Sequence, residues 1–415
     1  MSSTAVLTCH GCHQTRPVES PAVRCPCGGL LDLELAPDLG GAELRTIFDA
    51  RLGATDPLAR SGVWRFRELV LPQPSHHPIS APEGNTPLIV APPVAEWVGI
   101  GDLALKHEGM NPTGSFKDRG MTVGITQALG GGNRWVACAS TGNTAASLAS
   151  YAARAGIRAL VLMPAGMVAP GKLSQALAYG ATVVEIRGDF DRCLRLVEQA
   201  ARELGVYLLN SINPFRIAGQ QSIVYEMLQQ RRWAVPDWIV LPAGNLGNTA
   251  AFGAALRLAA RQGLIDRLPR LAAVQAEGAA PFAASFRTGF SPLRPVTAKT
   301  VATAIQIGDP ASFDRAVRAI RDTDGVVTAV SDGEIIEAKR VVDRAGVGCE
   351  PASAAAVAGA RRLRREGVMN SSETVVAVLT GHLLKDPAPP GRAAEPVAID
   401  GTVDEIAQLL ERGGA

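Results

Sequence analysis

Short apolar runs alternate with longer alanine- and leucine-rich stretches between residues 134 and 212, and no other feature constrains the fold as strongly. The runs predict strands and the stretches predict helices: strands at 135–139, 159–163, 182–186 and 206–209, and helices at 144–155, 171–179 and 189–204. Strands that are apolar along their whole length are typical of a parallel sheet covered by helices on both faces.

The same alternation of apolar runs and helical stretches occurs again later in the chain and predicts a second sheet. Further apolar runs lie at 238–241, 271–275 and 374–379. We therefore expect an α/β fold with two open, mainly parallel sheet domains, plus a small N-terminal cysteine-rich segment resembling a zinc ribbon. The expected parts are the cysteine-rich segment at 1–35, a connector and the first part of the large domain at 36–110, a smaller domain at 111–225, and the rest of the large domain at 226–415.

Charge and hydropathy exclude several classes of function. The 41 Lys and Arg residues almost balance the 39 Asp and Glu residues, which gives a net charge of +2. This is not the excess of positive charge that binding to nucleic acid or an anionic membrane would require. No apolar run reaches the roughly 18–20 residues that span a bilayer. The first residues lack the basic and apolar regions of a secretory signal, so we expect a cytoplasmic protein with reduced cysteines.

Polar, glycine-containing loops follow three of the predicted strands, at 140–144, 242–248 and 380–382. Ligands of parallel sheets bind beyond the carboxyl ends of the strands, where such loops lie. The second loop opens an alanine-rich helix, and free N–H groups at a helix start favour a phosphate. An ordinary strand-to-helix turn is the alternative for that loop. Its spacing lacks the G-x-G-x-x-G fingerprint, so no dinucleotide is expected.

Lys117 is one of six lysines and lies where a turn-rich segment leads into a predicted helix. The positive end of the helix dipole disfavours a cation at this position and lowers the pKa of an amine. A lowered pKa suits a lysine that forms a Schiff base. The alternative is a solvated lysine in the first turn of a helix.

Three motifs occur in a fixed order: Asn-Pro-Thr-Gly-Ser-Phe-Lys-Asp-Arg-Gly from Asn111, Ser-Thr-Gly-Asn-Thr-Ala-Ala-Ser from Ser140, and Gly-Asn-Leu-Gly-Asn from Gly244. Together they resemble the motifs of the tryptophan-synthase-β-like (fold type II) pyridoxal-phosphate enzymes. The resemblance covers roughly residues 80–390 and includes five further segments, at 83–88, 210–216, 302–308, 349–353 and 379–382.

The resemblance implies that pyridoxal 5′-phosphate binds between the two sheets. Lys117 would carry it as a Schiff base, Asn143 would hydrogen-bond its 3′-oxygen, and Thr380 would face its pyridine nitrogen. A hydroxyl at that place stabilises a protonated pyridine less than a carboxylate would. The cofactor phosphate would bind the backbone N–H groups of the loop Gly244, Asn245, Leu246, Gly247 and Asn248.

Within the family, the chain resembles most closely the members that convert O-phospho-L-homoserine and water into L-threonine and phosphate. This resemblance implies a small-molecule phosphorylated amino acid as substrate and a homodimer. The substrate phosphate would be held by Ser140, Thr144, Ser211 and Arg216. A surface ion pair is the alternative for Arg216. Two other functions stay open: a related enzyme acting on another amino acid, such as a cysteate synthase or a serine/threonine dehydratase, and a zinc-ribbon binding protein without catalysis.

Four of the seven cysteines lie near the N-terminus, as Cys9-x-x-Cys12 and Cys25-x-Cys27. Thiolates from two such turns can complete a tetrahedral zinc site. We expect a structural rather than catalytic zinc ion, with His10 and His13 as substitute ligands. The alternative is a small region of reduced cysteines that packs on the rest of the protein.

Overall fold

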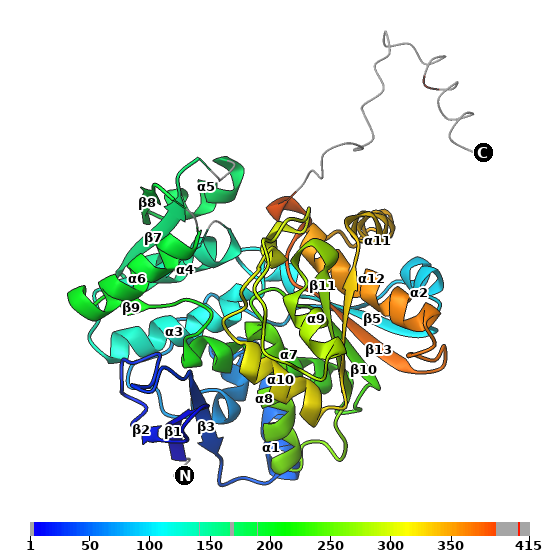
Figure 1. The fold of residues 1–415 in the computed structure, drawn as a ribbon. Helices are drawn as coiled ribbons and strands as arrows, with labels where there is room; N and C mark the ends of the chain where they lie inside the picture. Colours follow the sequence, from blue (N-terminus) through cyan, green and yellow to red (C-terminus); the bar gives the residue numbers. More distant parts are fainter. Residues whose placement is uncertain (1–3, 141, 167–169, 189, 387–405, 407–415) are drawn as a thin grey trace.

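The structure, a computed structural model, describes residues 4–140, 142–166, 170–188, 190–386 and 406. Within these residues the strands form three sheets (Figure 1). The two larger sheets are mainly parallel and are packed between helices, which confirms the predicted α/β fold class. No described helix is both long and apolar enough to cross a membrane.

The large sheet has six strands in the order β12-β11-β10-β13-β5-β4. Their bounds are β4 (Leu88–Val90), β5 (Asp102–His107), β10 (Trp238–Pro242), β11 (Arg270–Ala276), β12 (Val326–Val330) and β13 (Thr374–Leu379). All neighbouring strands are parallel except β4 and β5. The strands predicted at 238–241, 271–275 and 374–379 are confirmed, whereas β4, β5 and β12 have no counterpart among the predicted strands.

Side chains of the large sheet alternate between two hydrophobic cores, because successive residues of a strand point to opposite faces. The core on one face includes α1 (Gly41–Leu52), α7 (Pro214–Gln230), α8 (Gly247–Arg261), α9 (Pro281–Arg287) and α10 (Phe313–Asp322). The core on the other face includes α2 (Pro92–Val98), α11 (Asp332–Arg344) and α12 (Pro351–Arg365).

The small sheet has four parallel strands in the order β8-β7-β6-β9. They are β6 (Trp135–Ala139), β7 (Arg158–Pro164), β8 (Thr182–Ile186) and β9 (Tyr207–Leu208), close to the predicted strands. One face packs on α3 (Lys117–Gly130), α4 (Asn143–Arg154) and α5 (Pro170–Ala178), and the other packs on α6 (Phe190–Leu204). The helices predicted at 144–155, 171–179 and 189–204 correspond to α4, α5 and α6.

The cysteine-rich segment forms the third sheet, with antiparallel strands in the order β2-β1-β3. They are β1 (Thr4–Cys9), β2 (Thr15–Arg16) and β3 (Leu31–Ala36). Leu7 and Leu31 are fully buried and belong to the same hydrophobic core as α8 and α10. An ion pair of 2.7 Å between Asp32 and Arg315 of α10 adds to this contact. The segment is therefore packed on the large sheet's helices.

Four fully buried charged side chains join α3 to β5 and α7, and we call Lys106, Glu108, Arg119 and Glu226 the buried ion cluster. Arg119 lies 2.7 Å from Glu108 and 2.8 Å from Glu226. Lys106 lies 2.6 Å from Glu226. Because each charge has a partner of opposite sign, mutual attraction offsets the cost of removing these groups from water.

The loops predicted to bind ligands follow β6, β10 and β13 and lie at the carboxyl ends of these strands. The domain boundaries expected at residues 35, 110 and 225 stay a prediction. The part of the last expected domain that comprises 387–405 and 407–415 lies outside the described residues.

Candidate active site

Lys117 is the first residue of α3 and follows a loop that is bonded to the end of β13. The N–H of Phe116 donates to the carbonyl oxygen of Thr380 at 3.1 Å, and the N–H of His382 donates to that of Gly114 at 2.9 Å. These backbone bonds fix the start of α3 at the carboxyl end of the large sheet. Two residues predicted to bind the cofactor, Lys117 and Thr380, are thereby brought into neighbouring segments.

Asp118, which follows the lysine, anchors the loop and the first turn of α3. Its carboxylate accepts hydrogen bonds from the N–H of Thr113 at 2.7 Å, the hydroxyl of Thr113 at 2.6 Å and the hydroxyl of Ser147 on α4 at 2.6 Å. Burial raises the pKa of Asp118 to about 6, and the three hydrogen bonds oppose this rise. Asp118 therefore joins the lysine-bearing loop to the helix that follows β6.

Lys117 as a residue is partly exposed, but the surroundings of its amine disfavour the charged form. Burial lowers the pKa of Lys117 to about 7, and the positive charge of Arg216 lowers it further, while the charge of Glu350 acts in the opposite direction. A large fraction of the amine is consequently neutral near pH 7. A neutral amine is the nucleophile needed to attack an aldehyde carbon.

The loop at 140–144 lies between β6 and α4, and its first residue stabilises the turn. The hydroxyl of Ser140 accepts from the N–H groups of Gly142 at 3.2 Å and Ala145 at 3.3 Å. Asn143 begins α4, and its Nδ2 donates to Oε2 of Glu350 at 3.0 Å. Thr144 is half-buried in the first turn of the same helix. Ser140 thus has a structural role in addition to its predicted contact with substrate.

Arg216 lies in the first turn of α7, where Asn213 caps the helix by accepting from the N–H of Arg216 at 3.1 Å. The side chain is 1% exposed, and its Nη1 donates to the carbonyl oxygen of Leu209 at 3.0 Å. Within the described residues, its Nε and Nη2 have no hydrogen-bond partner. Burial lowers the pKa of Arg216 to about 10. A buried guanidinium with free N–H groups is suited to an anion that binds as a ligand.

Hydrogen bonds connect the predicted substrate residues to the predicted phosphate loop. Asn210 lies after β9 and accepts from the N–H of Ala139 on β6 at 3.0 Å, because the two strands are neighbours. The next residue, Ser211, accepts from Nδ2 of Asn245 at 2.7 Å. The segments that carry Ser140, Ser211 and Asn245 therefore converge.

The loop from Gly244 to Asn248 has the features of a phosphate site. A Cβ atom on Gly244 would lie 2.9 Å from Cα of Ile305, so the close approach of these two segments requires glycine. Among the described residues, Nδ2 and Oδ1 of Asn248 and Oγ1 of Thr249 are buried and have no hydrogen-bond partner. They lie in the first turn of α8, whose N–H groups also favour an anion. The donors among these groups, namely Nδ2 of Asn248, the hydroxyl of Thr249 and the N–H groups of the first turn, fit the phosphate of the cofactor implied by the sequence.

Thr380 follows β13, and its hydroxyl has two polar neighbours. Its Oγ1 lies 3.1 Å from Oγ of Ser353 and 3.5 Å from Oε1 of Glu350. Glu350 therefore lies between Asn143 and Thr380, although neither composition nor spacing assigned it a role. A signal is present in the sequence: Glu350 precedes a proline that begins a helix, and Glu is not among the usual residues at that position.

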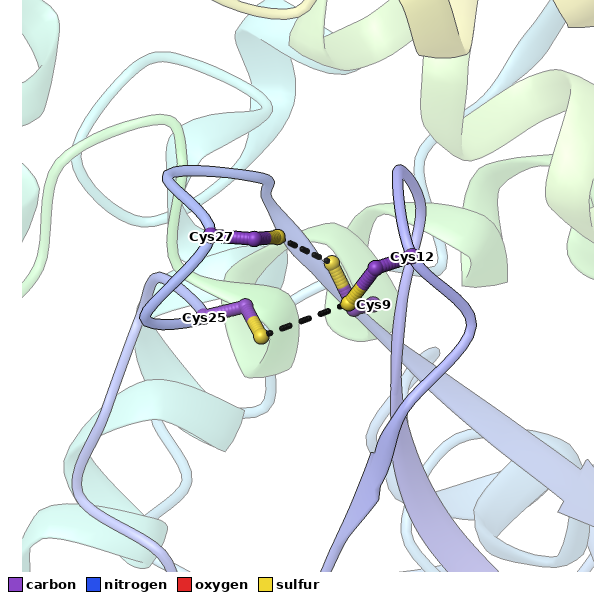
Figure 2. A group of neighbouring side chains, drawn as sticks. All are labelled: Cys9, Cys12, Cys25 and Cys27. Atoms are coloured by element: carbon purple, nitrogen blue, oxygen red, sulfur yellow. Dashed lines mark hydrogen bonds between the residues drawn. The ribbon is translucent and has the colours of Figure 1, made fainter.

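The four N-terminal cysteines form a compact group (Figure 2). Their Sγ atoms lie within 4.8 Å of one another, with 3.5 Å between Cys9 and Cys27 and 3.7 Å between Cys12 and Cys25. Tetrahedral zinc with bonds of about 2.3 Å would hold sulfur atoms about 3.8 Å apart. The N–H of Cys12 is the main cause that lowers the pKa of the Cys9 thiol to about 6. These features fit a zinc site of four cysteines.

Comparisons with known proteins agree with this arrangement. A model of the family described as pyridoxal-phosphate dependent enzyme matches residues 79–381. The threonine synthase of Methanocaldococcus jannaschii is 41% identical over 411 residues, which are 97% of this chain and 98% of that relative. The threonine synthase of Methanosarcina acetivorans is 48% identical over 351 residues, 84% of this chain and 86% of that relative. The solved threonine synthase of Escherichia coli has a similar fold, with a TM-score of 0.68, 20% identity, and coverage of 91% of this chain and 88% of that one.

Proposed function

Since the chain belongs to the pyridoxal-phosphate-dependent enzymes, and within them to the threonine synthases, we propose that it converts O-phospho-L-homoserine and water into L-threonine and phosphate. The observation that carries the choice of a phosphorylated substrate is Arg216, whose Nε and Nη2 are buried without a partner among the described residues. A free amino acid without a phosphate would leave this buried charge unmatched.

Lys117 is the proposed attachment residue for the cofactor and the proposed proton carrier. When bound, pyridoxal 5′-phosphate supplies a conjugated system that delocalises the negative charge left after a proton leaves Cα of the amino acid. The low pKa of Lys117, about 7, allows its amine to accept and return protons near neutral pH. Asn143 and Thr380 would bind the polar edges of the cofactor ring, and the loop 244–248 would bind its phosphate.

Ser140, Thr144, Ser211 and Arg216 are the proposed ligands of the substrate phosphate. They would hold this group while it leaves Cγ, and water then supplies the hydroxyl at Cβ. The planar guanidinium of Arg216 can offer two parallel N–H groups to phosphate oxygens. By positioning the leaving phosphate and stabilising its negative charge, these residues would account for much of the catalysis.

Turnover of O-phospho-L-homoserine by the chain loaded with pyridoxal 5′-phosphate tests the proposal. Phosphate and threonine should appear in equal amounts. Related enzymes give other outcomes: a cysteate synthase would use phosphoserine, and a dehydratase would form a keto acid from serine or threonine. Phosphate release without threonine, or faster formation of a keto acid, would contradict the proposed reaction. A non-catalytic binding protein is disfavoured by the similarity to threonine synthases over most of the chain.

The attachment residue has a separate test. Borohydride reduction of the loaded chain should leave the cofactor covalently bound to the peptide that contains Lys117, as measured by mass spectrometry. Lys117→Ala should lose both the visible absorbance and the activity, whereas Lys299→Ala, at an exposed lysine, should keep both. An active Lys117→Ala chain with normal absorbance would exclude this assignment.

We also propose a structural zinc ion held by Cys9, Cys12, Cys25 and Cys27. The expected content is one zinc per chain, released by a thiol-modifying reagent and accompanied by a lower melting temperature. Cys12→Ser should reduce the zinc content, and retention of a full equivalent by that variant would argue against the site.

A homodimer and a cytoplasmic location remain further proposals, which light scattering and cell fractionation would test.

A further inference from the structure

Glu350 is a buried carboxylate that does not serve the helix it precedes. It occupies the position before Pro351 at the start of α12, and its side chain makes no capping bond to that helix. Glu350 is nevertheless buried, with only 4% of its surface exposed. An ionised carboxylate removed from water needs hydrogen bonds or charges of opposite sign. The partners of Glu350 therefore explain why it is placed here.

Those partners belong to the candidate cofactor site. Oε2 of Glu350 accepts from Nδ2 of Asn143 at 3.0 Å, and Oε1 lies 3.5 Å from the hydroxyl of Thr380. The carboxylate lies against Gly381: a Cβ atom there would be 2.4 Å from Cδ of Glu350. Glycine at 381 thus leaves the space that the carboxylate fills. Glu350 connects α4, beside the small sheet, to the residues that directly follow β13 of the large sheet.

The charges around Glu350 come from both sides of the site. Burial raises the pKa of Glu350, while the Asn143 amide and the positive charges of Lys117 and Lys385 oppose this rise and Asp386 adds to it. The hydrogen bond with Asn143 is the shorter of the two to this carboxylate. Glu350 therefore restricts the orientation of the Asn143 side chain more strongly than that of the Thr380 side chain.

This bond determines which end of the Asn143 amide can face the centre of the site. The Asn143 amide and the charges of Lys117 and Lys385 favour the ionised form of Glu350. An ionised carboxylate only accepts hydrogen bonds, whereas an amide has one end that donates two and one end that accepts. Glu350 must therefore be met by the NH₂ group of Asn143, which leaves the second N–H of that group available. If the amide turned over, its carbonyl oxygen would face the carboxylate, and two acceptors would oppose each other.

We infer that Glu350 is a positioning residue that orients the Asn143 amide so that its second N–H is offered to the 3′-oxygen of the cofactor. The inference rests on the proposed binding of pyridoxal 5′-phosphate by Asn143. The 3′-oxygen is an electron-rich acceptor, so it requires a donor at this position. Glu350 acts on the cofactor through Asn143 and needs no contact with the reacting atoms.

A double-mutant cycle on cofactor affinity tests this inference. Glu350→Met keeps a similar volume but removes the acceptor, and Asn143→Ala removes the amide. Each single variant should raise the dissociation constant of pyridoxal 5′-phosphate for the cofactor-free chain by about 10- to 100-fold, the equivalent of one hydrogen bond to a charged group. The double variant should be no weaker than Asn143→Ala alone, because Glu350 acts through that residue.

Two further variants separate orientation from a general structural role. Glu350→Gln keeps an acceptor oxygen and should retain most of the affinity. Glu350→Asp keeps the charge but is one methylene shorter, so it should lose the bond to Asn143 and bind the cofactor as weakly as Glu350→Met. Glu334→Gln is the matched control, since Glu334 is also a helix-start glutamate but belongs to a capping box on α11. That control should bind the cofactor as the unchanged chain does.

The pH dependence of the visible absorbance of the loaded chain provides a readout besides activity. Glu350→Met should shift its midpoint less in the Asn143→Ala background than in the unchanged chain, because part of the effect of Glu350 passes through Asn143. Independent, multiplying losses of affinity in the double variant would overturn the inference, as would normal affinity in both Glu350→Met and Glu350→Asp. If the unchanged chain fails to bind pyridoxal 5′-phosphate, the proposed function fails instead, so the two failures are distinguishable. Should Glu350→Met not fold, Glu350→Asp still decides the outcome.

Discussion

The buried ion cluster and the candidate active site are two buried polar regions on neighbouring parts of α3, and they differ in how their groups are paired. Arg119 in the cluster lies within 2.8 Å of the two carboxylates of Glu108 and Glu226. Arg216 in the candidate active site is equally buried, yet its Nε and Nη2 have no partner among the described residues. The first arginine is matched within the chain, and the second is suited to a ligand that the chain does not supply.

The difference provides a way to separate structural from ligand-binding polar groups. Groups paired within the protein stabilise the fold, and loss of one leaves the others buried without compensation. Groups without a partner cost stability and are compensated when a ligand binds. The same residue change should therefore have opposite consequences in the two regions.

Arg119→Met has the largest expected effect on stability. It removes the cation that lies between Glu108 and Glu226 and should lower the free energy of unfolding by about 3–5 kcal/mol. Chemical denaturation monitored by circular dichroism measures this loss. Arg267→Met, which breaks an exposed ion pair with Asp237, is the control and should cost less than about 1 kcal/mol. Equal losses in both variants would mean that the cluster is no more important than a surface pair.

Arg216→Met makes the same replacement in the candidate active site. It should lower kcat/KM for O-phospho-L-homoserine by about 100- to 1000-fold, comparable to removal of a donor that binds a developing anion. The melting temperature of the cofactor-free chain should stay the same or rise, because an unmatched buried charge disappears. A strong loss of stability with little loss of activity would assign Arg216 to the structure rather than to the substrate.

The pH dependence of cofactor loading should report the environment of Lys117. Its pKa of about 7 implies that the loading rate of the cofactor-free chain rises about tenfold per pH unit below pH 7 and levels off above it. Arg216→Met should move the midpoint upward and Glu350→Gln should move it downward, because these residues lower and raise that pKa. A midpoint near pH 10 in stopped-flow absorbance would contradict this assignment.

The same pKa affects the stability of the cofactor-free chain. Between pH 10.5, the ordinary value for a lysine, and about 7, the unfolded chain binds more protons at Lys117 than the folded chain does. The contribution of this group therefore becomes more unfavourable to the fold as the pH falls through that window, and it levels off below about 7.

Two threonine-to-valine changes give the smallest effects and compare the regions without altering charge. Thr86 donates to Oε1 of Glu108 at 2.6 Å, so Thr86→Val should cost about 1–3 kcal/mol of unfolding free energy. Thr249→Val removes a hydroxyl without a described partner and should cost less than about 0.5 kcal/mol. The latter should instead weaken binding of pyridoxal 5′-phosphate by about tenfold. Calorimetry on both variants, with and without cofactor, measures these effects. A larger loss of stability in Thr249→Val than in Thr86→Val would contradict the comparison.

The sequence predicts the parts of the fold whose signal is local. The apolar runs of β6, β7 and β10 identify these strands because nothing charged interrupts them. In contrast, β5 contains Lys106, whose charge is fully buried. Its partner, Glu226, is distant in the sequence but lies 2.6 Å away in the structure. The order of the large sheet likewise depends on contacts between distant segments, which a local pattern does not contain.

The same limit applies to the candidate site. The loops at 140–144 and 244–248 and Thr380 lie in contiguous motifs, and the family resemblance predicts roles for them. Glu350 also lies within a segment of that resemblance, at 349–353, yet its proposed role depends on a bond to Asn143, which belongs to the other sheet's helices. Pairing between distant side chains therefore had to be seen in the structure.

Strand β13 has a consequence for the order in which the protein is assembled during synthesis. It pairs with β5 on one side and β10 on the other, although β5 is made early and β13 is made close to the end of the described chain. Until β13 leaves the ribosome, two sheet edges lack their common neighbour, and unpaired edges are templates for aggregation. Thr380 arrives immediately after it. A chain released before that point would be an aggregation hazard rather than a smaller enzyme.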